Sequence, residues 1–337
     1  MIMVRGEDVP HHPPYITSLK VNGIEKCRKP DMEFWGRYWP VYKYLNEAPD
    51  KFCGRRKLKI EKIETPLIVD GYETLEGWWP WHAALYRYED GSLSYICGGT
   101  LISEYLVLTA AHCVTINGVK VNPETLGVVL GKYSLYGRDT ATQSIEVFAV
   151  EVHDDFKREG YRNDIAILKL NTAAVYNNYV QPACIWFDEI YDVLGTYHIT
   201  GTVAGWGFDR SEKLTKKLQV ATLPIVPDVT CIMLEPIYYT NMLDGKKFCA
   251  GHQNGTAPCN GDSGGGLVVF VRDPSVRFVE TLVKPKSYPG AWYVRGIVST
   301  TLSKTNERAV CDPNGYTVFI DVAKYRDWIF SYMNRRF

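Results

Sequence analysis

The sequence lacks two features that would point to a membrane or to nucleic acid. No apolar run approaches the roughly 20 residues that a membrane-spanning helix needs. There is also no excess of one charge, because 38 lysine and arginine residues balance 38 aspartate and glutamate residues. A chain without a basic surplus has no general attraction to nucleic acid or to an anionic membrane surface. We therefore expect neither a nucleic acid nor a membrane among its partners.

The first residues also lack the apolar core, about 7 to 15 residues long, of a secretory signal peptide. Nine cysteines nevertheless stand at spacings that suggest disulfide bridges, which belong to an oxidising compartment. Both observations fit the C-terminal part of a longer secreted protein, and this is our expectation. The predicted location is therefore extracellular. The 337 residues, 46% of them hydrophobic, are enough for a sizeable core.

The composition changes near residue 67. Residues 1–67 carry helix-breaking prolines, a crowd of aromatic side chains at 34–44 and a basic run at 55–59. We interpret them as an irregular linker that includes a solvated or protease-sensitive basic stretch; the alternative is the end of a small disulfide-linked binding module. Residues 68–337 alternate short β-branched runs with turn residues, which predicts an all-β barrel domain. Strands are expected at 126–130, 145–152 and 165–170, and a helix at 322–333.

Three short segments carry residue types that together support nucleophilic catalysis. Ser263 stands between Asp262 and two glycines, a pattern that a simple turn explains equally well when it is taken alone. A serine hydroxyl becomes a good nucleophile only beside a base, and the base needs an orienting carboxylate. His112 and Asp164 lie upstream and complete the chain order His, Asp, Ser.

With these segments, the chain from about Ile68 to its end resembles the trypsin/chymotrypsin family of serine endopeptidases. The resemblance implies two six-stranded antiparallel β-barrels, closed by a C-terminal helix, with the catalytic cleft between them. It implies that Ser263 is the nucleophile, that His112 is the general base, and that Asp164 orients the imidazole.

The resemblance also assigns supporting roles. Ser299 matches the serine whose hydroxyl supports the aspartate, and the N–H groups of Gly261 and Ser263 match the oxyanion hole. Cleavage between Leu67 and Ile68 is expected to free an α-amino group. This group would pair with Asp262 and order the oxyanion loop.

The cysteine pairing expected here comes from the resemblance. It implies the bridges Cys53–Cys184, Cys97–Cys113, Cys231–Cys249 and Cys259–Cys311. The first of these would keep the N-terminal piece attached after cleavage. A further family bridge is missing as a pair, because Gly201 and Val269 occupy its two positions. Cys27 is left without a partner.

The predicted specificity pocket has no charge at its floor. Ala257, six residues before Ser263, replaces the acid that would bind a basic side chain, so we do not expect trypsin-like cleavage. Ser299, Thr301 and Thr317 are expected to make the pocket shallow, as in elastases, for small or medium aliphatic side chains. Because Leu67 is such a residue, we predict that the zymogen activates itself; the alternative is cleavage by another protease.

A narrower resemblance is to the insect modular serine proteases, which start haemolymph cascades leading to Toll activation and melanisation. It implies downstream protease zymogens as substrates, with pattern-recognition proteins and serpins as further partners. The alternatives are a digestive elastase-like protease and a catalytically inactive homologue that acts as a scaffold. No cofactor or metal is expected, since Lys132 stands where calcium-binding relatives have a carboxylate ligand.

Overall fold

The computed structural model describes residues 19–21, 24–26, 53–58, 71–89, 91–139, 141–187, 199–209, 211–272, 290–304 and 307–334. Leu67, Ile68, Cys27 and the aromatic stretch at 34–44 lie outside these residues, so the predictions made for them stay predictions. The chain divides into two compact units, residues 1–48 and 49–337. In the first unit, β1 (Leu19–Val21) and β2 (Ile24–Lys26) form an antiparallel pair.

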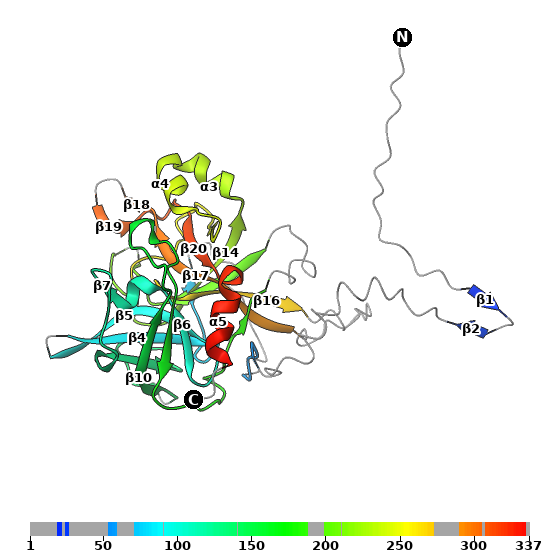
Figure 1. The fold of residues 1–337 in the computed structure, drawn as a ribbon, viewed down its shortest axis with the longest axis horizontal. Coiled ribbons are helices and arrows are strands. Elements are labelled where there is room, and N and C mark those ends of the chain that lie inside the picture. Colours follow the sequence, from blue (N-terminus) through cyan, green and yellow to red (C-terminus); the bar gives the residue numbers. More distant parts are fainter. Residues whose placement is uncertain are drawn as a thin grey trace, which may run out of the picture. The chain divides into compact units, whose positions relative to one another are not determined.

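The first half of the larger unit is a closed barrel in the strand order β10-β11-β6-β5-β4-β9. Its strands β4, β5, β6 and β10 are labelled in Figure 1. β9 shows why these residues form a barrel wall, because Leu126, Val128 and Leu130 are buried while the residues between them are half-exposed. The strands are β4 (His82–Glu89), β5 (Ser92–Leu101), β6 (Leu106–Thr109), β9 (Leu126–Leu130), β10 (Gln143–Val152) and β11 (Ala166–Leu170).

The second half is also a closed barrel, because β17 pairs with β20 as well as with β16. Its six strands are β13 (Thr200–Gly205), β14 (Gln219–Val226), β15 (Lys247–Ala250), β16 (Gly266–Arg272), β17 (Gly290–Thr301) and β20 (Thr317–Asp321). Two short strands join this sheet at its side, β3 (Tyr72–Glu73) on β14 and β12 (Cys184–Ile185) on β17.

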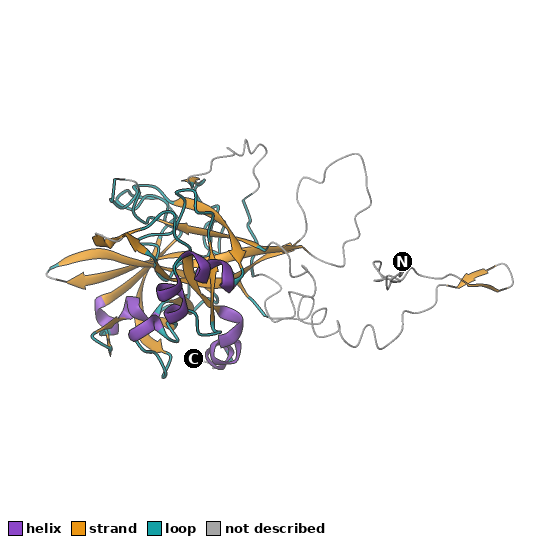
Figure 2. Cartoon of the chain, turned by 90° about the horizontal axis from the view of Figure 1, so that it is seen from above, coloured by secondary structure: helices purple, strands orange, loops and turns teal. Residues whose placement is uncertain are grey.

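The remaining elements are short and lie around the strands (Figure 2). Two small antiparallel pairs are β7 (Thr115–Ile116) with β8 (Val119–Lys120) and β18 (Ser303–Lys304) with β19 (Glu307–Cys311). The 3-10 turns are η1 (Ala111–Val114), η2 (Pro123–Thr125), η3 (Glu159–Tyr161) and η4 (Val322–Tyr325), and the last leads into helix α5 (Arg326–Met333). No helix in the described residues is long and apolar enough to cross a bilayer.

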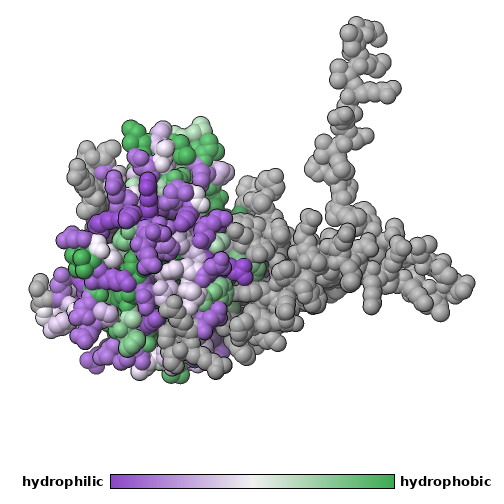
Figure 3. Space-filling view, in the orientation of Figure 1, coloured by the Kyte–Doolittle hydropathy of each residue, from purple (hydrophilic) through white to green (hydrophobic). Residues whose placement is uncertain are grey.

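The predicted fold class is confirmed, including the two barrels and the C-terminal helix. One difference is a pair of helices between β14 and β15, α3 (Asp228–Leu234) and α4 (Pro236–Met242), which we had not expected. Their apolar residues do not follow one buried face: Cys231 and Tyr239 are buried, while Met233 and Ile237 are more than three-quarters exposed. Figure 3 shows hydrophobic residues at the surface where these helices lie.

Four disulfides fasten the larger unit, and they join the pairs that the resemblance implies. They are Cys53–Cys184, Cys97–Cys113, Cys231–Cys249 and Cys259–Cys311. Gly201 and Val269, which replace a further pair of cysteines, lie on adjacent second-barrel strands. A Cβ on Gly201 would come within 2.0 Å of the Leu267 side chain, so that space is already filled without a bridge.

Candidate active site

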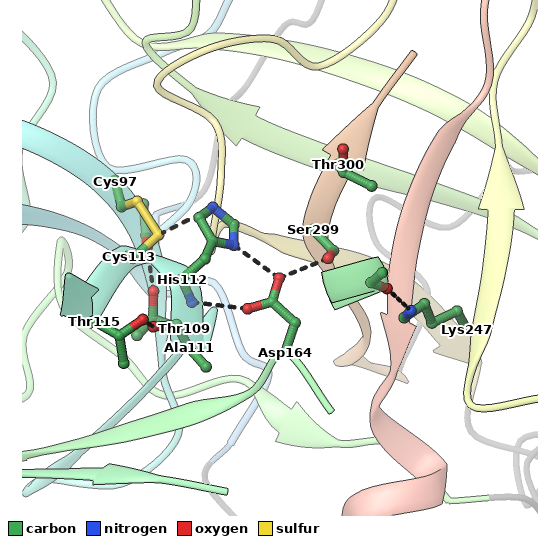
Figure 4. Close-up of polar contacts among 12 residues, drawn as sticks. Cys97, Thr109, Ala111, His112, Cys113, Thr115, Asp164, Lys247, Ser299 and Thr300 are labelled. Atoms are coloured by element: carbon green, nitrogen blue, oxygen red, sulfur yellow. Dashed lines mark hydrogen bonds and ion pairs between the residues drawn. A yellow bond between two sulfur atoms is a disulfide. The ribbon is translucent and has the colours of Figure 1, made fainter. Parts of the chain in front are cut away.

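An imidazole, a carboxylate and a hydroxyl meet between the two barrels. His112 lies in η1 and Asp164 precedes β11, both in the first barrel, while Ser299 lies on β17 of the second. The Asp164 carboxylate is fully buried and accepts a hydrogen bond from the Ser299 hydroxyl at 2.6 Å. Its oxygens also lie 2.8 Å from the backbone nitrogen of His112 and 2.7 Å from the ring Nδ1 (Figure 4).

These contacts fix the tautomer of the imidazole. An ionised carboxylate only accepts hydrogen bonds, so the short contact to Asp164 places a proton on Nδ1 of His112. The other ring nitrogen, Nε2, is then an acceptor in the neutral ring. The side chain of His112 is 16% exposed, whereas that of Asp164 is not exposed at all. The arrangement therefore presents one basic nitrogen to the cavity described below, held in place from behind.

Ser263 lies on a loop that contacts both barrels. Its carbonyl accepts a hydrogen bond from the N–H of Gly98 in β5 at 2.8 Å, and the next N–H, of Gly264, donates to Val298 in β17 at 2.9 Å. Gly264 has a φ of +77°, and a Cβ there would come within 2.2 Å of the Thr109 hydroxyl. Only glycine lets the loop pass this close to the segment that carries the imidazole.

The carboxylate of Asp262, next to Ser263 in the chain, is held by backbone N–H groups. Its oxygens accept hydrogen bonds from the N–H groups of Gly207 at 2.8 Å and Cys259 at 3.0 Å. They also occupy the space that side chains at Gly205 and Gly207 would take. Asp262 as a residue is partly exposed, but its carboxyl group is enclosed, and this burial raises its pKa from 3.8 to about 6. Within the described residues no lysine, arginine or histidine forms an ion pair with it.

Two neighbouring cavities surround this loop. The first, about 500 Å³, is lined by His112, Gly261 and Ser263, and by residues 298–301 of β17. The second, about 590 Å³, is lined by Ala257 and Asp262. The Cys259–Cys311 disulfide lines both. The predicted nucleophile, base and oxyanion donor are thus brought together, whereas the predicted pocket floor lies on the other side of this disulfide.

The predicted wall residues do not all reach a cavity surface. Ser299 and Thr301 line the cavity that holds Ser263. The Thr301 hydroxyl donates to the carbonyl of Pro258 at 2.9 Å and lies 3.2 Å from the hydroxyl of Thr317. Thr317 is fully buried, so it supports Thr301 from behind. Its predicted contact with a bound side chain stays a prediction.

Several residues at the site could not be found from sequence. The Tyr161 ring meets His112 edge to face, with centroids 5.4 Å apart, and its φ is +48°. The carbonyl before it, of Gly160, accepts a hydrogen bond at 2.7 Å from Lys247, a buried lysine that also donates to Met242 at 2.8 Å. Tyr95 donates to the carbonyl of Gly261 at 2.6 Å. Neither a lysine nor a tyrosine in a strand gives a sequence signal of such contacts, because lysine side chains are mostly exposed and tyrosine side chains are found both buried and exposed.

The site also contains a group of potential metal ligands, Cys97, His112 and Cys113, whose atoms lie within 4.8 Å of one another. The two sulfurs are joined to each other, and a disulfide sulfur lacks the thiolate charge that zinc requires. These residues do not fit a metal centre. The 3.8 Å contact between the Cys113 sulfur and Nε2 of His112 (Figure 4) only limits where the imidazole can turn.

Comparison with known proteins gives consistent matches over the two barrels. The family model described as Trypsin matches residues 68–329. Chymotrypsin-C of Mus musculus is 33% identical over 78% of this chain and 87% of its own length. Vitamin K-dependent protein C of Mus musculus is 31% identical over 84% of this chain and 59% of its own length. Serine protease gd of Drosophila melanogaster is 28% identical over 81% of this chain and 54% of its own length. The chain therefore spans little more than half the length of the last two relatives.

Proposed function

Because this chain belongs to the trypsin family of serine proteases, we propose that it is a secreted endopeptidase zymogen that acts through Ser263, His112 and Asp164. One observation carries this proposal. The buried Asp164 carboxylate accepts hydrogen bonds from both Ser299 and His112, and His112 lines the same cavity as Ser263. A scaffold without activity would not need a buried aspartate to hold the imidazole in one tautomer.

The proposed reaction follows from these positions. The Ser263 oxygen attacks the carbonyl carbon of the scissile bond while its proton passes to Nε2 of His112. The resulting imidazolium is stabilised by the Asp164 carboxylate, 2.7 Å from Nδ1, which stays ionised. The oxyanion would be bound by the N–H groups of Gly261 and Ser263. The proton then moves to the leaving amine, and water hydrolyses the ester on Ser263 by the same steps.

For activation, we propose cleavage between Leu67 and Ile68, followed by pairing of the new α-amino group with Asp262. Support comes from the state of Asp262, a carboxyl group with an elevated pKa, held by two N–H groups on the wall of a cavity of about 590 Å³. Gly71, three residues after Ile68, lines the same cavity, so the new N-terminus starts within reach of it. The Cys53–Cys184 disulfide keeps the cleaved piece attached.

For specificity, we propose cleavage after small or medium aliphatic residues. Ala257, which lines the neighbouring cavity, is the proposed uncharged floor, and Thr301, backed by the buried Thr317, is proposed to shorten the pocket. Leu67 fits this preference, which supports self-activation. Protein substrates of an extracellular cascade, downstream protease zymogens among them, fit a disulfide-tethered zymogen better than digestion does. From the resemblance to the insect modular serine proteases, we propose an innate immune (Toll/melanisation) cascade, with pattern-recognition proteins and serpins as partners; an insect serine protease is among the relatives.

Three experiments test the proposal. After cleavage at Leu67, an organophosphonate should label Ser263 covalently, and a wild-type protein that stays unlabelled would be an inactive homologue. Peptides with Leu, Ala, Phe or Arg before the scissile bond should be cleaved fastest after Leu or Ala, and a preference for Arg would overturn the pocket assignment. Self-activation predicts that purified Ser263→Ala protein stays uncut between Leu67 and Ile68 while wild type is cut.

A further inference from the structure

A short segment of the N-terminal extension, residues 53–58, is fixed against the barrels. Cys53 is bonded to Cys184, and the Gly54 N–H donates to the carbonyl of Pro182 at 2.7 Å. The Gly54 carbonyl accepts from the N–H of Trp292 at 2.9 Å. Gly54 has a φ of +64°, and a Cβ there would come within 2.6 Å of the Trp292 backbone. Covalent and backbone contacts therefore set the position of the following side chains.

The next contact corrects the expectation of a solvated basic run at one residue. Arg56 is inserted among four tryptophans, whereas Arg55 and Lys57 on either side of it are exposed. The central guanidinium carbon lies 4.4 Å from the ring centroid of Trp78, 4.1 Å from Trp79, 5.9 Å from Trp81 and 4.4 Å from Trp292. In the described part of the chain its Nε and Nη2 atoms are buried without a hydrogen-bond partner. The faces of the indole rings thus take the place of water and of hydrogen-bond acceptors around this cation.

Such a cage favours a guanidinium over other side chains. A guanidinium is planar and weakly hydrated and stacks on aromatic faces, whereas an ammonium is strongly hydrated and needs acceptors for its three N–H groups. Burial lowers the pKa of Arg56 from its ordinary value to about 9, so the side chain is still charged at neutral pH. An uncharged side chain would fill the volume without the attraction between the cation and the ring faces.

The cage is built from both barrels. Trp79 and Trp81 immediately precede β4, and the Trp81 carbonyl accepts a hydrogen bond from Leu101 in β5 of the first barrel at 2.8 Å. Trp292 belongs to β17 of the second barrel, and its ring meets that of Trp79 edge to face with centroids 5.1 Å apart. A cation seated between these rings attracts both barrels at once.

We propose that Trp78, Trp79, Trp81 and Trp292 form a guanidinium-binding cage, and that Arg56 occupies it as an intramolecular ligand that clamps the two barrels together. The extension is then more than a disulfide-linked remnant, since one of its side chains completes the contact between the barrels. The clamp is independent of the proposed proteolytic activity, and its test needs no substrate.

The test compares Arg56→Ala, Arg56→Met and Arg56→Lys with Lys57→Ala, a change at an adjacent exposed residue. The full chain with its disulfides is heated with and without n-propylguanidinium, which reproduces the arginine side chain, and with n-butylammonium as the control cation. We expect Arg56→Ala to lower the unfolding temperature by roughly 4 °C or more. Adding propylguanidinium should raise the unfolding temperature of Arg56→Ala back toward that of wild type, with an effect that saturates as its concentration rises. It should also change the tryptophan fluorescence of this variant. Butylammonium should change neither the unfolding temperature nor the fluorescence of Arg56→Ala. The wild-type and Lys57→Ala proteins should not respond to either cation.

The clamp also predicts where the structure loosens. In Arg56→Ala, exchange of the Leu101 and Trp292 amide protons should accelerate at least about tenfold. Their acceptors lie beside the cage, the Trp81 carbonyl in the first barrel and the Gly54 carbonyl in the extension. An Arg56→Met protein as stable as wild type would show that the cage only needs an apolar side chain, and this would overturn the proposal. An Arg56→Lys protein as stable as wild type would overturn the preference of the cage for a guanidinium. If Arg56→Ala does not fold, the Met and Lys variants decide alone.

Discussion

The ionisation of Asp262 gives the sharpest test of the proposed activation by a new N-terminus. In the continuous chain its pKa is raised from 3.8 to about 6 by burial, so the folded protein holds this proton more tightly than the unfolded protein. As the pH rises from about 4, the unfolded state releases the proton first, and the free energy of unfolding falls until the pH passes about 6. A shift of about two pKa units corresponds to a decrease of about 3 kcal/mol.

The measurement is denaturant unfolding of Ser263→Ala protein, which cannot cut itself, with and without the additional change Asp262→Asn. Tryptophan fluorescence reports unfolding at a series of pH values from about 3.5 to 7, with the disulfides intact. Asparagine does not titrate, so the difference between the two proteins isolates the carboxyl group from every other ionisation. The stability of the protein that keeps Asp262, relative to the Asp262→Asn variant, should decrease by about 3 kcal/mol over this range. A difference that stays constant, or rises with pH, would refute burial as the cause.

Cleavage between Leu67 and Ile68 should reverse the sign of this comparison. If the new α-amino group reaches Asp262, the ion pair holds the carboxyl pKa below its ordinary value, and Asp262 then stabilises the protein at neutral pH. This gain should disappear as the pH rises above about 8, where an α-amino group loses its proton. Cleaved protein that keeps the pH dependence of the continuous chain would show that the new N-terminus does not pair with Asp262.

Three further substitutions test the site. Ser299→Ala removes the 2.6 Å hydrogen bond to the buried Asp164 carboxylate, so steady-state kinetics should show kcat reduced roughly 10- to 100-fold with a smaller change in KM. Lys247→Met leaves two carbonyl oxygens without their donor, and denaturant unfolding should show a loss of about 2–4 kcal/mol, whereas Lys246→Met at an exposed hydrogen bond should cost less than about 1 kcal/mol. Gly264→Ala forces a side chain onto a φ of +77° and into its neighbours, so thermal unfolding should show a midpoint lower by roughly 10 °C or more.

The positions of strands followed from local sequence signals, whereas the two-barrel architecture was implied by the resemblance to the trypsin/chymotrypsin family. Alternation along β9 depends only on which residues face the barrel interior, and strand 126–130 was placed at its observed bounds. The helices α3 and α4 were missed because their exposed faces carry Met233 and Ile237, which removes the contrast between a buried and a solvated face. Hydrophobic periodicity identifies a helix or strand only when its exposed face is polar and its buried face is apolar.

The site was predictable only where a residue type is tied to a role. His112 and Asp164 stand in short segments of distinctive composition, and the structure places them 2.7 Å apart. Lys247 and Arg56 give no such signal, because a lysine in a strand and an arginine in a basic run are most often solvated. Their burial depends on residues far away in the sequence, such as Gly160 for Lys247 and Trp292 for Arg56. These partners are known only once the two barrels are assembled.

The assembled site bears directly on self-activation. The His112, Asp164 and Ser299 contacts are already formed in a chain that is continuous across the proposed bond. The Gly98 to Ser263 hydrogen bond, which joins the barrels beside them, is also present. On the proposed activation route, cleavage would leave these contacts in place and would change the charge facing Asp262, next to the proposed oxyanion donors Gly261 and Ser263. The uncleaved protein should then react slowly with an organophosphonate at Ser263, and cleavage should accelerate the reaction. A rate of zero before cleavage would rule out self-activation, because the first molecule to be cut needs another that is already reactive.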